Sequence, residues 1–332
     1  MSYESEKQVA IQAALAAARL CQRVHQEIVP QAIEKNDRSP VTVADFGSQA
    51  VICHTIAAAF PNDPIVGEED AAVLRQPDMA TCLQQVTHYV QSEIPDATPE
   101  AVVSWIDRGN GGIGSRYWTL DPIDGTKGFL RQDQYAVAIA LIENSDVKVG
   151  VLACPALPID LSQPTQDHGV LFVAVRGQGA AMMPLQGGEP KPIHVSTAEQ
   201  ADRLRFVESV ESGHGNHDLQ DAVAKAVGIQ ASSIRMDSQA KYGAVAQGEA
   251  ALYLRLPSPK SPNYREKIWD HAAGVLIVEE AGGKVTDMHG APLKFSLGST
   301  LEANQGVVVS NGSIHEGVLQ VLREQLTTSI GR

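Results

Sequence analysis

Two aspartates, Asp121 and Asp124, are the residues of this chain whose type and spacing most suit chemistry. They lie in the stretch DPIDGT over residues 121–126, where we expect the proline and the glycine to force a turn. Such a turn would present both carboxylates and the carbonyl of Ile123 to one small volume, with the hydroxyl of Thr126 directly behind. Mg²⁺ prefers hard oxygen ligands in an octahedral shell and keeps several waters, so two aspartates and a substrate phosphate oxygen suit it. The stretch therefore predicts a Mg²⁺ site.

Two further acidic motifs accompany this stretch: Glu68 within Gly67–Asp70, and Asp270 within Trp269–Gly274. Each motif alone has a simpler explanation. Asp, Pro and Gly are ordinary turn residues, an acidic run is most often solvated, and Asp270 could be the N-cap of a helix. All three, however, lie where an apolar run meets a turn or a helix start, which is where α/β proteins build sites. Together they predict a Mg²⁺-dependent phosphomonoesterase.

Composition limits the classes of protein that need to be considered. The chain has 332 residues, 43% hydrophobic and 20% charged, which is typical of a globular protein of about two domains. No segment approaches about 18 uninterrupted apolar residues and the N-terminus is acidic, so we expect neither a membrane span nor a signal peptide. The net charge of −13 argues against a nucleic-acid polymer as partner, but not against a small anion that binds through divalent cations. We infer no obligate protein partner.

The four cysteines are widely spaced and form no CxxC pair. We expect them to be buried and reduced, as in a cytoplasmic protein. They are Cys21, Cys53, Cys82 and Cys154.

The pattern of apolar residues changes near residue 196, from an α+β part that favours an antiparallel sheet to an α/β part of alternating short strands and helices. We expect a catalytic and metal-binding half over residues 1–196, and a substrate-binding half over 197–332 that contributes Asp270. Residues 71–100 are polar and predict only helix or loop. Helices are expected at about 5–29, 45–59, 217–228, 239–248, 270–281 and 313–325. Strands are expected at about 65–66, 101–107, 116–121, 135–143, 147–154, 170–175, 205–208, 234–236, 251–256 and 306–310.

Two motif matches fail on their context. Gly109–Gly114 matches G-x-G-x-x-G, but the dinucleotide fingerprint needs a helix directly afterwards, and residues 116–120 predict a strand. Asp121 and Asp124 are separated by two positions, whereas the D-x-D-x-T signature of covalent aspartyl phosphatases has one. We therefore expect water to be the nucleophile.

The three acidic motifs together, in this order, resemble the lithium-sensitive, Mg²⁺-dependent phosphatase superfamily that includes inositol monophosphatase. Finer features resemble its 3′(2′),5′-bisphosphate nucleotidases, which remove the 3′-phosphate from adenosine 3′,5′-bisphosphate. These features are the stretches Ser39–Asp45, Lys127–Arg131, Met236–Tyr242 and Glu266–Asp270. The resemblance covers about residues 5–325 and matches no specific pattern over residues 71–115. It implies a layered αβαβα sandwich of the inositol monophosphatase / fructose bisphosphatase type, with an α+β and an α/β half.

The resemblance also implies a role for each candidate residue. Two or more Mg²⁺ ions would be held by four carboxylates and one carbonyl, those of Glu68, Asp121, Asp124, Asp270 and Ile123. Asp45 and Thr126 would activate the attacking water, because a carboxylate that accepts the threonine proton lets the hydroxyl oxygen polarise that water. The substrate would be bound by residues of both halves: Gly125, Thr126, His214, Ser238, Lys241, Arg255 and Asp270. Backbone N–H groups near Gly125 would cradle the phosphate if they open a helix.

Three functions stay open on the sequence alone. The first is hydrolysis of the 3′-phosphate of adenosine 3′,5′-bisphosphate to AMP, and of its sulfated analogue, as part of sulfur assimilation. The second is the same chemistry on an inositol phosphate or a sugar bisphosphate. Lys127, Lys241 and Arg255 weigh against it, because a single phosphate needs fewer cations. The third is an idle protein that senses Mg²⁺ or binds a partner; it would lack a carboxylate or Thr126, and each of these positions is filled.

Overall fold

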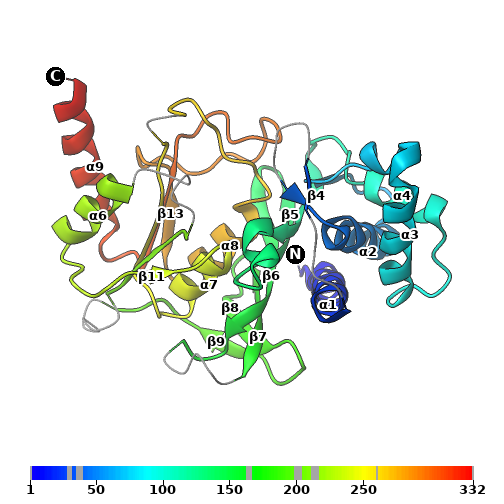
Figure 1. Cartoon of the computed structure of the whole chain (residues 1–332). Helices are drawn as coiled ribbons and strands as arrows, with labels where there is room; N and C mark the ends of the chain where they lie inside the picture. The colour runs from blue at the N-terminus through cyan, green and yellow to red at the C-terminus, as the bar shows by residue number, and fades with distance from the viewer. Residues whose placement is uncertain are drawn as a thin grey trace.

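The described residues form two large β-sheets, with helices outside and between them, and one small two-stranded sheet. The computed structural model describes residues 2–27, 32–34, 40–161, 167–197, 204–210, 217–258 and 261–330. Across the molecule the layers follow one another as helices, sheet, helices, sheet, helices, with α3 and α4 at one end and α9 at the other (Figure 1). The αβαβα sandwich expected from the sequence is therefore the observed architecture.

The first sheet has seven strands in the order β3-β4-β5-β6-β7-β8-β9. Strand β3 runs parallel to β4, and the later strands pair antiparallel with their neighbours. This agrees with the antiparallel character expected of the first half. The strands are β3 (Ile65–Gly67), β4 (Arg116–Asp124), β5 (Ala136–Glu143), β6 (Asp146–Pro158), β7 (His168–Val175), β8 (Ala180–Pro184) and β9 (Lys191–Ile193).

Helices α1 (Glu4–Glu27) and α2 (Val43–Ala59) cover one face of this sheet. The buried face of α1 is rich in alanine, so the two helices approach closely, and a Cβ on Gly47 of α2 would lie 3.1 Å from Leu20 Cδ1. Outside them lie α3 and α4, and a short hairpin precedes α2. These outer elements are β1 (Ile33–Glu34), β2 (Pro40–Val41), η1 (Val73–Arg75), η2 (Pro77–Met79), α3 (Ala80–Gln91) and α4 (Pro99–Asp107).

Helices α7 (Ala240–Ala246) and α8 (Ala272–Glu280) form the middle layer. Strand β5 is buried on both faces and turns Val137, Ile139 and Leu141 toward α1 and α2, while its alanines and Ile142 face the middle layer. Small residues let α8 lie close to the sheet: a Cβ on Gly150 of β6 would be 2.8 Å from the carbonyl oxygen of Ala273. The start of α8, which carries one of the acidic motifs, is thereby held against the first sheet.

The second sheet has five strands in the order β11-β10-β12-β14-β13. Strand β10 runs parallel to β11 and β12, whereas β14 runs antiparallel to β12 and β13. Helices α6 and α9 cover its outer face over a third apolar core. The elements are β10 (Phe206–Glu208), α6 (His217–Ala226), β11 (Ile234–Arg235), β12 (Leu252–Arg255), β13 (Lys284–Thr286), β14 (Val307–Ser310) and α9 (His315–Ile330).

One predicted strand is wrong. Residues 101–107 belong to α4, which begins after Thr98, whose hydroxyl accepts the N–H of Ala101 at 3.3 Å, and has Pro99 in its first turn. The buried Val102 and Ile106 are four residues apart, which is a helical period. Strands β8, β9 and β13 were not expected from the sequence. The expected end of the first helix, near residue 29, lies outside the described residues.

The first sheet ends at Ile193 and the second begins at Phe206, on either side of residue 196. On this basis we propose the division of the chain into two halves.

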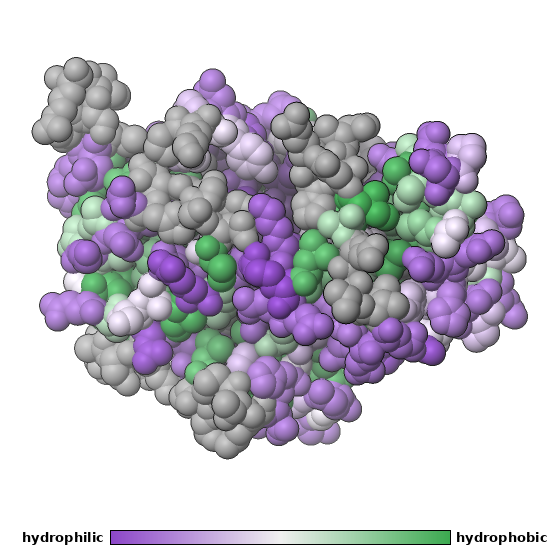
Figure 2. All heavy atoms as spheres, in the orientation of Figure 1, coloured by the Kyte–Doolittle hydropathy of each residue, from purple (hydrophilic) through white to green (hydrophobic). Residues whose placement is uncertain are grey.

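On the face seen in Figure 2, apolar residues show as separate patches among hydrophilic ones. No described helix is both long enough and apolar enough to cross a membrane.

Candidate active site

The aspartate pair lies on a bulge at the end of β4, and not in a turn as the sequence analysis expected. Asp121 pairs with Ala138 of β5 and Asp124 with Ala136, so three steps along β4 match two along β5. Residues three apart in a regular strand point to opposite faces, and the extra residue of a bulge re-aims its side chain. The reversal of the chain follows at Gly125, whose φ of +86° suits glycine.

Glu68 is brought beside this pair by parallel pairing. Gly67 of β3 is in register with Leu120 of β4, so the next residues of the two strands, Glu68 and Asp121, are neighbours. The backbone after Glu68 is held by Gln49 of α2, whose side chain accepts the N–H of Glu69 at 3.0 Å and donates to its carbonyl. The acidic run is thus not simply solvated, since Glu69 is buried.

Asp45 and Thr126 are in contact. Asp45 is buried in the first turn of α2, where the N–H and hydroxyl of Thr42 donate to its Oδ2 at 2.8 and 2.6 Å. Its Oδ1 lies 3.3 Å from the hydroxyl oxygen of Thr126, which opens the short helix α5 (Thr126–Leu130). The same hydroxyl lies 3.2 Å from the carbonyl oxygen of Ile123. One threonine proton therefore has two possible acceptors, a carboxylate and a carbonyl of the bulge.

Asp270 reaches the site from the second half. It precedes α8, and the N-cap of that helix is His271, so Asp270 is not the helix cap that a simpler interpretation would make it. Burial, and then the carboxylate of Asp124, raise the pKa of Asp270 well above its usual range. Asp270 therefore belongs electrostatically to the cluster on β4.

The four carboxylates repel one another. Burial, followed by Glu68, Asp124 and Asp270, raises the pKa of Asp121 well above its usual range. Burial also raises the pKa of Asp124, although Lys241 opposes the shift. A divalent cation relieves such repulsion, and the donors here are all oxygen, as Mg²⁺ prefers. These residues therefore fit Mg²⁺.

Lys241 and Arg255 supply positive charge next to the carboxylates. Lys241 is buried in α7, where its Nζ donates to the carbonyl of Met236 at 3.3 Å, and burial lowers the pKa of Lys241 to about 8. Arg255 ends β12 and forms an ion pair with Glu266 at 3.1 Å. Burial opposes both charges, yet the Arg255 guanidinium and the His271 hydrogen bond lower the pKa of Glu266 to about 2. The carboxylate of this ion pair is buried and the arginine side chain is 20% exposed, so it is not the surface pair that an arginine at a strand end usually makes.

Glu266, Asp270 and His271 form a second possible cation group, because each offers a ligand atom within 4.8 Å of the others. Two of the three are otherwise engaged. Glu266 holds Arg255, and the Nδ1 of His271 lies 2.7 Å from the hydroxyl of Tyr242. We therefore assign this group to the support of Arg255.

Of the remaining predicted cations and substrate residues, Ser238 lies at the site. Ser238 has a left-handed backbone, φ +66°, and its hydroxyl accepts the N–H of Ala240 at 3.1 Å in the turn before α7, whose N-cap is Gln239. Lys127 is exposed. His214 lies outside the described residues. The sequence analysis gave no role to Gln239 or to Glu266, although both stand inside stretches that carried the family resemblance.

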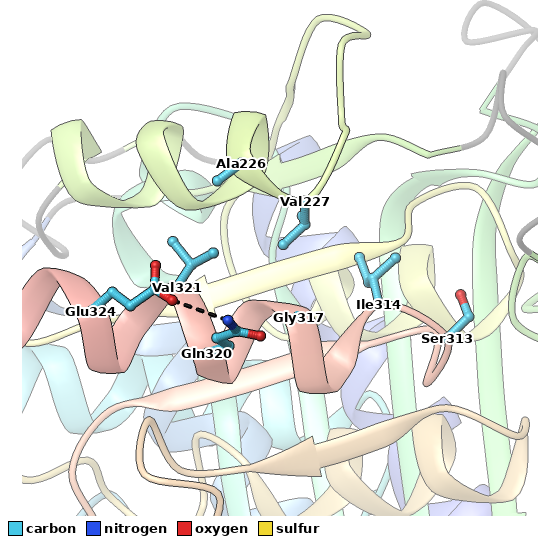
Figure 3. Close-up of a pocket in the computed structure, with 8 residues that line it drawn as sticks. All are labelled: Ala226, Val227, Ser313, Ile314, Gly317, Gln320, Val321 and Glu324. Carbon is cyan, nitrogen blue, oxygen red and sulfur yellow. Dashed lines mark hydrogen bonds between the residues drawn. The ribbon is translucent and has the colours of Figure 1, made fainter.

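A surface hollow of about 360 Å³ between α6 and α9 lies apart from this site (Figure 3). Its lining carries none of the predicted catalytic, metal or substrate residues. The residues that line it are Ala226, Val227, Ser313, Ile314, Gly317, Gln320, Val321 and Glu324.

Comparison with known proteins identifies the family of this chain. The model of the inositol monophosphatase family matches residues 2–327. The 3′(2′),5′-bisphosphate nucleotidase of Schizosaccharomyces pombe is 44% identical over 96% of this chain and 95% of its own length. That of Emericella nidulans is 43% identical over 98% of this chain and 99% of its own. The chain belongs to the inositol monophosphatase family, whose members are in general Mg²⁺-dependent phosphatases.

Solved structures show the same fold. The IMPase of Thermotoga maritima superposes with a TM-score of 0.67 at 21% identity, covering 98% of this chain and 99% of that one. The inositol monophosphatase of Anabaena gives a TM-score of 0.64 at 23% identity, covering 98% and 97%. The fold expected from the sequence resemblance is confirmed.

Proposed function

We propose that this protein hydrolyses the 3′-phosphate of adenosine 3′,5′-bisphosphate to AMP, and acts likewise on its sulfated analogue. The proposal is carried by the similarity of this chain, over nearly its whole length, to 3′(2′),5′-bisphosphate nucleotidases. In this same chain, Thr126 contacts Asp45 beside the four carboxylates. The positive charges of the buried Lys241 and the half-buried Arg255 support a substrate with a second phosphate.

The cluster is suited to hold two or more Mg²⁺ ions. Their ligands would be the carboxylates of Glu68, Asp121, Asp124 and Asp270 and the carbonyl of Ile123. When bound, the ions supply Lewis-acid stabilisation of the charge on the reacting phosphate. Glu68, Asp124 and Asp270 are each partly exposed, whereas Asp121 is buried, so the cluster is open on one side.

Asp45 and Thr126 would move the proton of the attacking water. The two hydrogen bonds from Thr42 are made to Oδ2 of Asp45, and Oδ1 faces Thr126 and can accept its proton. The threonine oxygen then accepts a proton from water, whose oxygen attacks phosphorus. The bond from phosphorus to the 3′-oxygen breaks, and that oxygen takes a proton from solvent water and leaves as the 3′-hydroxyl of AMP, while the proton taken up by Asp45 returns to solvent. The first turn of α5 adds N–H donors that suit a phosphate.

Lys241 and Arg255 would hold the phosphate that is not cleaved. The Glu266 carboxylate fixes the Arg255 guanidinium at 3.1 Å, so the arginine is oriented before a substrate binds. The other residues of the proposed substrate set are Gly125, Thr126, Ser238, Asp270 and, outside the described residues, His214. A cytoplasmic location stays a prediction; all four cysteines are free, three of them buried and Cys82 half-buried.

The test is phosphate release from adenosine 3′,5′-bisphosphate and from an inositol monophosphate, each with and without Mg²⁺. We expect release to require Mg²⁺ and kcat/KM to be at least about 10-fold higher on the nucleotide, because a second phosphate adds charge-assisted contacts. Equal or faster hydrolysis of the inositol phosphate would assign the chain to the second candidate substrate class.

A further inference from the structure

One short segment of the second half, Asp237–Gln239, contacts the first half beside the carboxylate cluster. Asp237 forms an ion pair with Arg131 of the first half. Ser238 adopts its left-handed backbone where it packs on Gly125, on which a Cβ would lie 3.0 Å from the Cβ of Ser238. A non-glycine residue in this conformation is sustained by its surroundings, so the junction is a built contact.

Gln239 makes the hydrogen bonds of this junction to both groups of candidate metal ligands. Its backbone N–H donates to Oδ2 of Asp124 at 2.7 Å. Its side-chain Nε2 donates to the carbonyl of Trp269 at 2.9 Å, and its Oε1 accepts the N–H of Gly274 at 3.2 Å. A carbonyl can only accept and an N–H can only donate, so the orientation of the amide is determined. The side chain is 2% exposed.

These three hydrogen bonds orient two carboxylates, one from each half of the chain. The N–H on Oδ2 of Asp124 orients that carboxylate and leaves its other oxygen for a cation. The bonds to Trp269 and Gly274 fix the backbone on either side of Asp270. We propose that Gln239 is a positioning residue that holds Asp124 and Asp270 at the spacing at which they bind Mg²⁺ together. The inference rests on the proposed function for the identity of the metal, and on no property of the substrate.

A merely structural role would leave metal affinity unchanged. A buried amide with satisfied hydrogen bonds stabilises the fold wherever it lies, and its loss lowers the stability of the metal-free protein. Removal of a group that orients a metal ligand weakens metal binding by about 10- to 100-fold. The two roles therefore differ in a measurement that uses no substrate.

The experiment is a titration with Mg²⁺ of wild-type protein and of Gln239→Met, followed by the rise in melting temperature and by calorimetry. Methionine keeps the approximate volume and loses both side-chain hydrogen bonds. The matched control is Gln220→Met in α6, another buried glutamine, whose Nε2 has no partner among the residues that the structure describes. We expect half-saturation at about 10-fold or more higher Mg²⁺ for Gln239→Met, and wild-type half-saturation for Gln220→Met.

If Gln239→Met does not fold, Gln239→Asn serves in its place. It keeps the amide but is one methylene shorter, so it cannot reach both Trp269 and Gly274, and the same weakening is expected. Unchanged Mg²⁺ affinity in a folded Gln239 variant, or equal weakening in Gln220→Met, would overturn the proposal. A wild-type protein that binds Mg²⁺ but leaves adenosine 3′,5′-bisphosphate intact would contradict the proposed substrate and not the role of Gln239.

Discussion

At the scale of single residues, the hydroxyl group of Thr126 can donate a hydrogen bond either to Asp45 or to the carbonyl of Ile123. Threonine and valine have nearly the same shape, so Thr126→Val removes the hydroxyl with little repacking. We expect kcat/KM to fall by about 10²- to 10⁴-fold, the usual contribution of a positioned proton acceptor. Thr126→Ser keeps the hydroxyl and should retain activity within about 10-fold. Comparable activity of the valine and serine variants would remove Thr126 from the reaction. The measurement is steady-state phosphate release.

Replacement of Arg255 alone would change the stability of the protein as well as its binding of substrate. Arg255→Ala strands the Glu266 carboxylate in the interior, and breaking a buried ion pair in this way costs about 3–5 kcal/mol of stability. The informative variant is the pair Arg255→Gln with Glu266→Gln, which removes the positive charge without leaving a negative one unpaired.

For that double variant we expect kcat/KM on adenosine 3′,5′-bisphosphate to fall roughly 10- to 150-fold, the value of a charge-assisted contact of about 1.5–3 kcal/mol. The loss on adenosine 3′-monophosphate should be much smaller, because that substrate has no second phosphate. Equal losses on the two nucleotides would show that Arg255 acts on the cleaved phosphate or on the fold. Glu266→Gln alone serves as the control for the lost carboxylate.

At the scale of elements, the end of β4 and the start of α5 form one functional unit. The bulge between Asp121 and Asp124 re-aims two side chains, and Gly125 then turns the chain into α5. Gly125 is under two constraints, since its φ is +86° and its missing Cβ makes room for Ser238. Gly228, after α6, has a φ of +90° but open space around it.

Gly125→Ala should therefore reduce the stability of the protein more than Gly228→Ala does. A left-handed alanine costs about 1–2 kcal/mol at either position. At Gly125 the contact with Ser238 adds to this cost and also displaces the Asp124 and Thr126 groups on either side. We expect the free energy of unfolding, measured with urea, to fall more for Gly125→Ala than for Gly228→Ala. Only Gly125→Ala should also lower kcat/KM, by at least about 10-fold. Equal effects of the two substitutions would mean that only the backbone conformation matters.

At the scale of the whole molecule, a buried histidine makes stability depend on pH. His315 starts α9 and is fully buried; its ring lies 2.8 Å from the hydroxyl of Ser310 and 2.9 Å from that of Thr286. Thr286 donates its own proton to the carbonyl of Asp287, so it accepts from Nε2 of His315, and Nδ1 accepts from Ser310. Burial, and then the charge of Lys284, lower the pKa of His315 from 6.5 to about 4.

The sign of the pH effect follows from this shift. As the pH falls below about 6.5, the unfolded chain binds a proton at His315 that the folded chain does not, so stability decreases until about pH 4. The full effect is on the order of 3 kcal/mol. His315→Gln keeps hydrogen-bonding groups and cannot titrate. We expect it to be less stable than wild type at pH 8, with a smaller loss of stability between pH 6.5 and 4, as measured by urea unfolding. Parallel stability curves for the two proteins would contradict this.

Much of the architecture could be predicted from local pattern. The helices over 45–59, 217–228, 239–248 and 270–281 were each found within a few residues of their expected bounds, because spacing and end signals are local properties. The stretch 101–107 was mistaken for a strand because a short apolar run fits both periods. The short β8, β9 and β13 were missed because their pairing partners, and not their own composition, make them strands.

The sequence by itself determined which residue types were available for chemistry: the carboxylates, the threonine and the cations, and the motif order that placed the chain in its family. Only the tertiary structure decided how they meet. The bulge in β4, the register of β3 and the contact of Asp45 with Thr126 each depend on pairing between distant segments. The roles of Glu266 and Gln239 depend on it most. A glutamine or a glutamate in sequence is an ordinary polar residue, and only burial against specific partners turns it into the orienting group of a site.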